Sequence, residues 1–201
     1  MEGTGRVRAI GDGVSDVAVG DRVAWAEPLG SYAELAVIPA ADAVAVPDAV
    51  PDDAAVGAML QGMTAHFLVH DAYPVHPGDD VLVHAAAGGV GHLAVQIAAR
   101  REVSIAATAR TGNHAFLREL GVSDPIDYRT TDFTTAVRDV DLVVDLIGGD
   151  YTDRSLTVLS GTGAVVAAEG PATHRDSRVR RFYVDPTTAA PAELAAAGGG
   201  G

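Results

Sequence analysis

The spacing of hydrophobic and polar residues changes near residue 50. Before that point, short stretches such as residues 5–11 alternate apolar and polar side chains, and Gly-Asp turns separate them. This pattern is typical of half-exposed β-strands joined by tight turns. Residues 32–38 form another run that predicts a strand. We therefore expect a small β-rich barrel or sandwich over residues 1–52.

Beyond Pro47 and Pro51 the pattern becomes an alternation of strands and helices. Asp52 or Asp53 can cap a helix that runs from residue 54 to about residue 70. Apolar runs that predict strands lie at 81–84, 104–109, 125–128, 141–147 and 163–168, and helical patterns lie at 93–101, 113–120, 130–138 and 150–159. Such alternation implies right-handed crossovers. The expected fold class is α/β, a Rossmann-like parallel sheet with helices on both faces, over residues 53–186.

A glycine-rich turn joins the 81–84 strand to the helix that follows it. Gly88, Gly89 and Gly91 crowd this turn, and Val90, Leu93 and Ile97 are expected on one face of the helix. The unpaired N–H groups and the dipole of a helix start favour an anion. The Gly-x-Gly-x-x-Gly frame of dinucleotide sites appears as Ala86, Gly88 and Gly91. The segment predicts a pyrophosphate site, with a plain tight turn as the alternative.

Composition and charge exclude several classes of protein. The chain has 201 residues and is 48% hydrophobic, so that it is not expected to be disordered. Its net charge of −13 makes it a poor partner for nucleic acid or an anionic membrane. No apolar run is long enough to span a membrane, and the N-terminus lacks the pattern of a secretory signal. The absence of cysteine excludes disulfides and fits a cytoplasmic location.

Histidine is the main candidate for a metal ligand. His66 and His70 have the i, i+4 spacing that can hold zinc on one helix face. Phe67 stands where an HExxH motif requires glutamate. We therefore expect structural or solvated histidines and no bound metal.

Four stretches of the chain together resemble a known family. They are VGDRVAWAEPLGSYAELAVIPA (19–40), AMLQGMTAHFLV (58–69), HPGDDVLVHAAAGGVGHLAVQIA (76–98) and ELGVSDPIDYRTTDF (119–133). They are similar to the zinc-independent, NADPH-dependent quinone oxidoreductases, the zeta-crystallin-like proteins of the medium-chain dehydrogenase/reductase superfamily. The resemblance implies that residues 1–52 are part of a GroES-like catalytic domain. It also implies that both ends of the family's chain are missing, with an Ala/Gly-rich tail at 187–201.

The residues after the second Rossmann strand indicate which cofactor is preferred. NAD sites usually carry an acidic residue there, whereas residues 108–114 contain no acid and include Arg110. A guanidinium can bind the 2′-phosphate of NADPH, although Arg110 could also be an ordinary solvated arginine. The resemblance places His114 at the family's phosphate-binding lysine and Tyr128 at the tyrosine that closes over the phosphate. Neutral histidine is a weaker partner than lysine, and its contribution depends on pH.

Two further cofactor contacts follow from the resemblance alone. It implies that the hydroxyl of Thr64 faces the nicotinamide and that the cofactor passes the backbone of Gly148. A threonine bonded to its own helix and a helix-entry turn are the alternatives. The expected cofactor-binding residues are thus Thr64, Gly88, Gly89, Val90, Gly91, Arg110, His114, Tyr128 and Gly148. No catalytic residue is identified.

The resemblance implies transfer of hydride from NADPH to a quinone or an α,β-unsaturated carbonyl compound, with the cofactor supplying the chemistry. The alternatives are a module that binds NADPH without turnover and an alcohol dehydrogenase-like member of the superfamily. The expected partner is a small-molecule substrate. Residues 179–184 read as a strand at a sheet edge, where the family pairs two copies, so that a homodimer is possible.

Overall fold

The computed structural model describes residues 2–26, 30–168 and 174–181. The chain divides into two compact units, one reaching to Met63 and the other covering Thr64–Val184. The division falls inside helix α1 (Asp52–His70), and the domain boundary expected after residue 52 stays a prediction. The predicted tail at 187–201 lies outside the described residues.

The first unit contains a three-stranded antiparallel sheet in the order β1-β2-β3. Its strands are β1 (Glu2–Arg6), β2 (Arg22–Ala26) and β3 (Val44–Ala45), and a single 3-10 turn, η1 (Ala40–Asp42), precedes β3. Ala24 and Ala26 pack with Met59 and Met63 of α1 in a small core. The small antiparallel sheet fits part of a GroES-like domain.

The prediction of a strand at residues 32–38 is wrong. These residues form bends and irregular structure, with Tyr32 fully exposed and Val37 97% exposed. A strand is stabilised by a neighbouring strand and by a buried face, whatever the propensity of its residues. No strand in the part of the chain that the structure describes pairs with this run.

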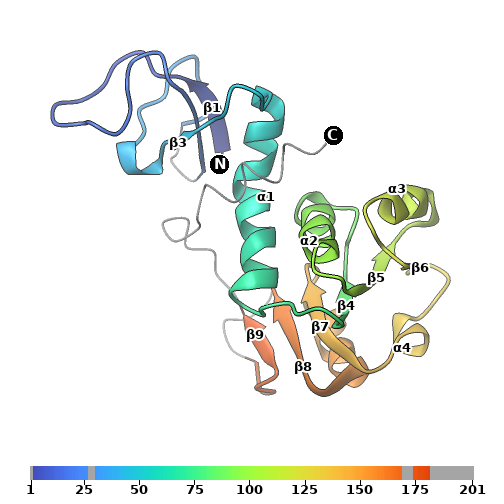
Figure 1. Ribbon diagram of the computed structural model, residues 1–201. Helices are drawn as coiled ribbons and strands as arrows, with labels where there is room; N and C mark the ends of the chain where they lie inside the picture. Colours follow the sequence, from blue (N-terminus) through green and yellow to red (C-terminus); the bar gives the residue numbers. More distant parts are fainter. Residues whose placement is uncertain (1, 27–29, 169–173, 182–201) are drawn as a thin grey trace. The chain divides into compact units, whose positions relative to one another are not determined.

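The second unit is built on six parallel strands in the order β6-β5-β4-β7-β8-β9 (Figure 1). They are β4 (Asp80–Val83), β5 (Ser104–Ala109), β6 (Asp124–Asp127), β7 (Val140–Asp145), β8 (Leu159–Ala167) and β9 (Val179–Arg181). The first strand of this sheet, β4, lies in its middle. The chain continues outward through β5 to β6 and then returns to form β7 on the other side of β4. The strand order reverses between β4 and β7, which is the topology of a Rossmann sheet. The predicted fold class is confirmed.

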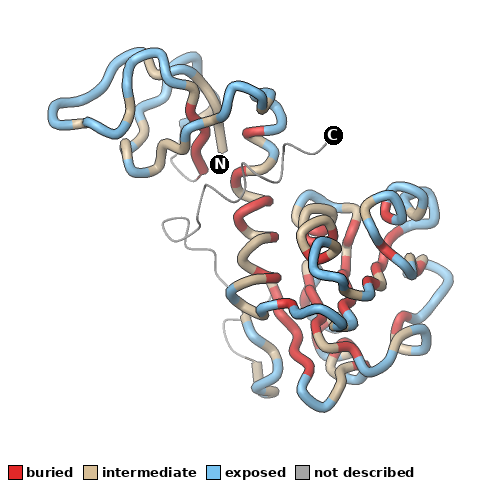
Figure 2. The backbone as a smooth tube through the Cα atoms, in the orientation of Figure 1, coloured by how far each residue is buried: buried red, intermediate tan, exposed pale blue. Residues whose placement is uncertain are grey.

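Helices cover both faces of this sheet. Val81 and Val83 of β4 pack with α2 (Gly89–Ala99) and α3 (His114–Glu119), whereas Leu82 packs on the opposite side. Successive residues of a strand point to opposite faces, so that these two clusters lie on the two sides of the sheet. The tube in Figure 2 is red along the central strands, where both faces are buried.

Helix α2 lies close to the sheet because its buried face is made of small residues. Gly91 is buried, and Ala94, Val95 and Ala98 are fully buried. Val90, Leu93 and Ile97, which were expected on one face of the helix, are partly buried and pack against the same core. The smallest side chains of the helix lie against the strands.

Two predicted helices are shorter than expected. The 130–138 segment contains only α4 (Phe133–Ala136), because Val137 is already extended and Asp139 has a positive φ of 54°. The 150–159 segment contains the short helix α5 (Asp150–Ser155), which is followed by the 3-10 turn η3 (Leu156–Val158). Strand β8 begins at Leu159, four residues before the predicted start, since Leu159 pairs with Val140 ahead of a register shift.

Among the strands that the structure describes, β9 forms one edge of the sheet and pairs only with β8. It confirms the predicted strand over Val179–Arg181, and residues 182–184 lie outside the described part of the chain. The homodimer remains a prediction. None of the helices in the described ranges has the length and hydropathy that a transbilayer segment requires.

Candidate functional site

The turn between β4 and α2 is held by backbone hydrogen bonds. Gly88 N–H donates to the carbonyl of Ala85 at 2.9 Å, and Ala86 N–H donates to the carbonyl of Thr108 in the next strand at 3.2 Å. Gly88 is the N-cap of α2 and offers no side chain to the first N–H groups of the helix. These groups can therefore bind an anion placed at the carboxyl edge of the sheet.

Gly91 fits closely against this turn. A Cβ atom added to Gly91 would collide with the carbonyl oxygen of Ala85 and would lie 2.7 Å from the Cα atom of Ala86. Both neighbours are backbone atoms, which cannot move aside as a flexible side chain would. Only glycine allows α2 to start this close to the strand.

His92 orients the peptide between Gly88 and Gly89, a role that the sequence did not predict. Its Nδ1–H donates to the carbonyl oxygen of Gly88 at 2.8 Å, and its backbone N–H donates to the same oxygen at 3.1 Å. In a trans peptide the C=O and N–H bonds point in opposite directions. Because the Gly88 carbonyl is turned toward the helix, the Gly89 N–H is turned away from it, toward the anion position.

Arg110 and Tyr128 come together at the ends of neighbouring strands. Arg110 follows β5 and Tyr128 follows β6, and the Nε–H of Arg110 donates to the Tyr128 hydroxyl oxygen at 3.0 Å. This hydrogen bond raises the pKa of the Arg110 guanidinium. It leaves the Nη groups and the phenolic proton able to donate to a further group. Both side chains are exposed, as a pair that receives a ligand must be.

Asp127 lies beside this pair and also escaped the sequence analysis. Its Oδ2 accepts from the backbone N–H of Thr111 at 3.0 Å and from the Thr111 hydroxyl, and its Oδ1 accepts from the N–H of Arg129 at 2.9 Å. The hydrogen bond from the Thr111 hydroxyl, followed by that from the Arg129 N–H, lowers the pKa of Asp127 to about 2. The only signal in the sequence is its place next to Tyr128, since its partner lies sixteen residues earlier.

His114 is the first residue of α3. Its Nε2 atom is buried and has no hydrogen-bond partner among the described residues. A nitrogen without exposed surface cannot reach a ligand in this conformation. His114 therefore needs a side-chain rotation to donate from this nitrogen to a phosphate.

Gly148 belongs to a turn that a buried carboxylate holds at the end of β7. Asp145 is fully buried, and its Oδ1 accepts from the N–H groups of Ile147 and Gly148, each at 2.9 Å. The hydroxyl of Thr152 donates to its Oδ2. Because β7 pairs with β4, this turn lies at the same edge of the sheet as the glycine turn. Thr64 lies on α1, partly buried, at the start of the second unit.

His84 is a buried structural histidine. Its Nδ1 lies 3.0 Å from the Thr108 hydroxyl and its Nε2 lies 3.1 Å from the Ser155 hydroxyl. Ser155 donates its only proton to the carbonyl of Tyr151 at 2.6 Å. We therefore assign the proton of the ring to Nε2, with Thr108 donating to Nδ1. Burial lowers the pKa of His84 to about 4, so that the ring is neutral at pH 7.

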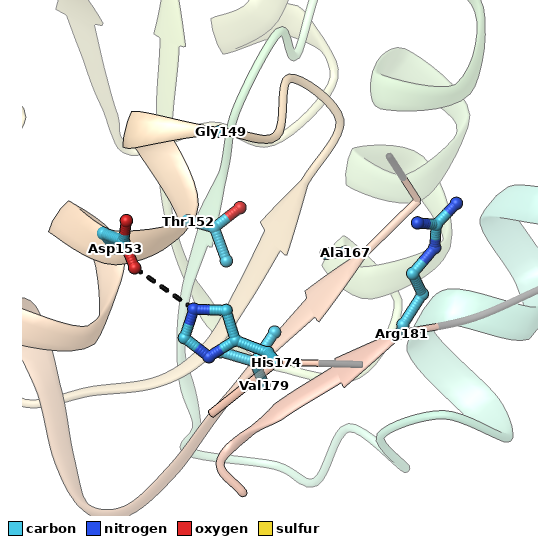
Figure 3. Close-up of a pocket in the computed structure, with 7 residues that line it drawn as sticks. All are labelled: Gly149, Thr152, Asp153, Ala167, His174, Val179 and Arg181. Carbon is cyan, nitrogen blue, oxygen red and sulfur yellow. Dashed lines mark hydrogen bonds and ion pairs between the residues drawn. The ribbon is translucent and has the colours of Figure 1, made fainter. Parts of the chain in front are cut away.

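A pocket of about 200 Å³ opens between α5 and strands β8 and β9 (Figure 3). His174 and Asp153 form a pair across one wall, with 3.1 Å between Nε2 and Oδ1. The Nδ1 of His174 accepts from the N–H of Asp176 at 3.0 Å, so that Nε2 carries the proton that is directed at Asp153. Both ring nitrogens are engaged within the chain. The remaining lining residues are Gly149, Thr152, Ala167, Val179 and Arg181.

The rings of His66 and His70 on α1 stack with 4.1 Å between their centroids, and the guanidinium of Arg101 donates to Nδ1 of His70 at 3.0 Å. Across the described ranges, no three side chains of His, Cys, Asp or Glu gather in a way that could hold a metal ion.

The strand order and the glycine turn between β4 and α2 are those of a Rossmann-type domain. Residues 120–197 match a family model described as zinc-binding dehydrogenase. The chain belongs to the quinone oxidoreductase family of the medium-chain dehydrogenase/reductase superfamily.

Relatives and solved structures support this assignment. The chain is 41% identical over 177 residues to the 2-haloacrylate reductase of a Burkholderia species, covering 83% of this chain and 53% of the relative. The structure of the Escherichia coli quinone oxidoreductase complexed with NADPH matches with a TM-score of 0.85 at 28% identity, over 98% of this chain and 66% of that one. Mycobacterial Rv1454c complexed with NADPH matches with a TM-score of 0.82 at 34% identity, over 98% and 67%. The chain spans about half the length of the curated relatives that it matches.

Proposed function

We propose that this chain binds NADPH and that the protein transfers hydride from it to a quinone or an α,β-unsaturated carbonyl compound without a metal ion. The observation that carries the proposal is the placement of two anion-binding features at one edge of the sheet. The uncapped start of α2 suits a pyrophosphate, and the Arg110–Tyr128 pair suits the 2′-phosphate. NADPH is the cofactor in two of the solved structures that resemble this chain.

The residues present fit this cofactor. Because Gly91 has no side chain, α2 starts close to the strand, and the N–H groups of Gly89 and Val90 would hold the pyrophosphate there, with no side chain at Gly88 to cover it. The nicotinamide half would pass Gly148 and reach Thr64. We keep His114 as a candidate for the 2′-phosphate, reached after rotation of its side chain.

Bound NADPH supplies the hydride. The chain itself would bind and orient the cofactor and the acceptor and would exclude water from them. The fixed Gly89 N–H and the Asp145-held turn would set the position of the dinucleotide along the sheet edge. We propose no side chain as proton donor and assign that role to water. The names of the relatives, quinone oxidoreductase and 2-haloacrylate reductase, support an electron-poor small-molecule acceptor.

Hydride transfer to this acceptor is separable from cofactor binding. Steady-state oxidation of NADPH with 1,4-benzoquinone tests it, with loss of absorbance at 340 nm as the signal. Turnover above the rate without protein supports the reductase. Saturable NADPH binding without turnover would instead make this chain a binding module.

Metal independence is a separate expectation. The chain has no cysteine, and the described residues offer no ligand set, which argues against an alcohol dehydrogenase-like zinc enzyme. Treatment with a chelator followed by dialysis should leave NADPH affinity and any turnover unchanged. Zinc present at one ion per chain, and lost together with binding, would contradict this.

Replacing Arg110 by alanine should change the affinities for NADPH and NADH by different amounts. The substitution removes a charged donor to the 2′-phosphate, so that NADPH binding should weaken by about 1.5–3 kcal/mol. NADH has a hydroxyl at that position, and its affinity should hardly change. Fluorescence titration with both cofactors measures the difference, and equal losses would remove Arg110 from the 2′-phosphate site.

A further inference from the structure

One carboxylate connects the two loops that carry Arg110 and Tyr128. Asp127 is the last residue of β6 and immediately precedes Tyr128. Its Oδ2 accepts two hydrogen bonds from Thr111, which immediately follows Arg110. Its Oδ1 accepts from the N–H of Arg129, on the other side of Tyr128. The Asp127 carboxylate therefore holds the backbone next to both members of the pair.

This arrangement matters because Arg110 and Tyr128 are themselves exposed. Their mutual hydrogen bond of 3.0 Å is surrounded by solvent, and exposed contacts between long side chains contribute little to order. Thr111 opens the 3-10 turn η2 (Thr111–Asn113), which has no side-chain cap of its own. Among the described residues, Asp127 is the only one whose side chain accepts a hydrogen bond from the Thr111 N–H.

We propose that Asp127 is the positioning residue for cofactor selectivity, and that its carboxylate keeps Arg110 and Tyr128 preorganised for a 2′-phosphate. This inference rests on the proposed NADPH binding and specifies what sets the preference for NADPH over NADH. Preorganisation improves affinity because the loops are ordered before the ligand arrives.

The negative charge of Asp127 does not stand against this role. A free carboxylate near a phosphate would repel it, but this one faces two donors of Thr111 and one of Arg129. Its charge also lies close enough to Arg110 to stabilise the guanidinium in its charged form. The carboxylate thus bonds to the loops and leaves the Arg110 Nη groups to the ligand.

The test compares NADPH and NADH affinities in matched variants of the full chain. Asp127→Ala should lower the preference for NADPH by about tenfold, as expected for loss of hydrogen bonds to a charged group. Thr111→Val removes only the hydroxyl donor and should lower the preference by a smaller factor in the same direction. Asp124→Ala, an exposed carboxylate at the other end of the same strand, should change neither affinity.

The NADH affinity separates positioning from a general loss of structure. Unfolding or a distorted glycine turn would lower the affinities for both cofactors equally, whereas loss of positioning would lower the affinity for NADPH alone. An Asp127→Ala chain with an unchanged preference for NADPH would overturn the inference. An Asp127→Asn chain that binds NADPH more tightly than the parent chain would also overturn it, because the carboxylate would then be repelling the phosphate. Asp127→Asn should instead retain part of the preference, because its amide oxygen can still accept from Thr111.

Arg110→Ala in the same series distinguishes two kinds of failure. If Arg110→Ala abolishes the preference and Asp127→Ala does not, only the role of Asp127 fails. If the parent chain shows no preference at all, the proposed function fails with it.

Discussion

Gly91→Ala is expected to abolish NADPH binding and to lower the free energy of unfolding by about 1–3 kcal/mol, the usual cost of overpacking. The added methyl group would meet the carbonyl of Ala85 and the Cα atom of Ala86, so that the start of α2 must move away from the strand. The N–H groups that face the pyrophosphate would move with it. Chemical denaturation and NADPH fluorescence titration measure the two effects.

Gly57→Ala is the matched control for this substitution. Gly57 lies on the exposed side of α1, with no atom within 4 Å of an added Cβ atom. Alanine there should raise stability by about 0.5–1 kcal/mol through helix propensity alone. A Gly91→Ala chain as stable as the parent, with unchanged NADPH affinity, would show that α2 does not pack against the turn as described.

Gly88→Val should separate binding from folding at the same turn. A Cβ atom on Gly88 would lie 3.1 Å from the carbonyl oxygen of Ala85, a distance that a small shift relieves. The branched side chain would still extend over the uncapped start of α2, where we place the pyrophosphate. The variant should therefore fold with nearly the stability of the parent chain and fail to bind NADPH.

Acidification from pH 6.5 to pH 4 should destabilise the chain by about 3 kcal/mol through His84 alone. Burial lowers the pKa of His84 to about 4 in the folded chain, from 6.5 in the unfolded chain. Between these values the unfolded state binds a proton that the folded state does not. The stability is therefore fully present above pH 6.5 and is lost as the pH falls toward 4. Denaturant titrations at a series of pH values measure the slope.

His84→Gln removes the titrating group and should flatten this part of the stability profile, although the variant is less stable at pH 7. Glutamine can keep one of the two bonds that the ring makes to Thr108 and Ser155. His76→Gln is the control, because the His76 side chain is 71% exposed. A parent chain whose stability is constant between pH 6.5 and pH 4 would contradict the burial of a neutral His84.

The parts of the fold that were predicted correctly depend on local pattern. The β4–turn–α2 unit follows from an apolar run, clustered glycines and a helical period within about twenty residues of sequence. Tyr128 was named only through the family resemblance, and it meets Arg110 because neighbouring parallel strands end at the same edge of the sheet. Strand propensity misled at residues 32–38, where the described structure provides no partner strand.

The contacts that were missed depend on tertiary geometry. Nothing in the sequence indicates that Asp127 reaches Thr111, because the two meet only when β5 and β6 lie side by side. His92 looks like any helical residue until its ring is seen on the carbonyl of Gly88. The early start of β8 was hidden because Gly161 and Gly163 weaken its strand pattern.

We propose that this chain holds a dinucleotide by its glycine turn and selects NADPH through the 2′-phosphate. Titration of the purified chain with NADPH and with NADH, followed by cofactor fluorescence, tests it most directly. We predict saturable binding of one NADPH per chain, with NADH weaker by at least about tenfold, the factor expected for one lost charged hydrogen bond. Absence of saturable binding, or equal affinities for the two cofactors, would contradict the claim.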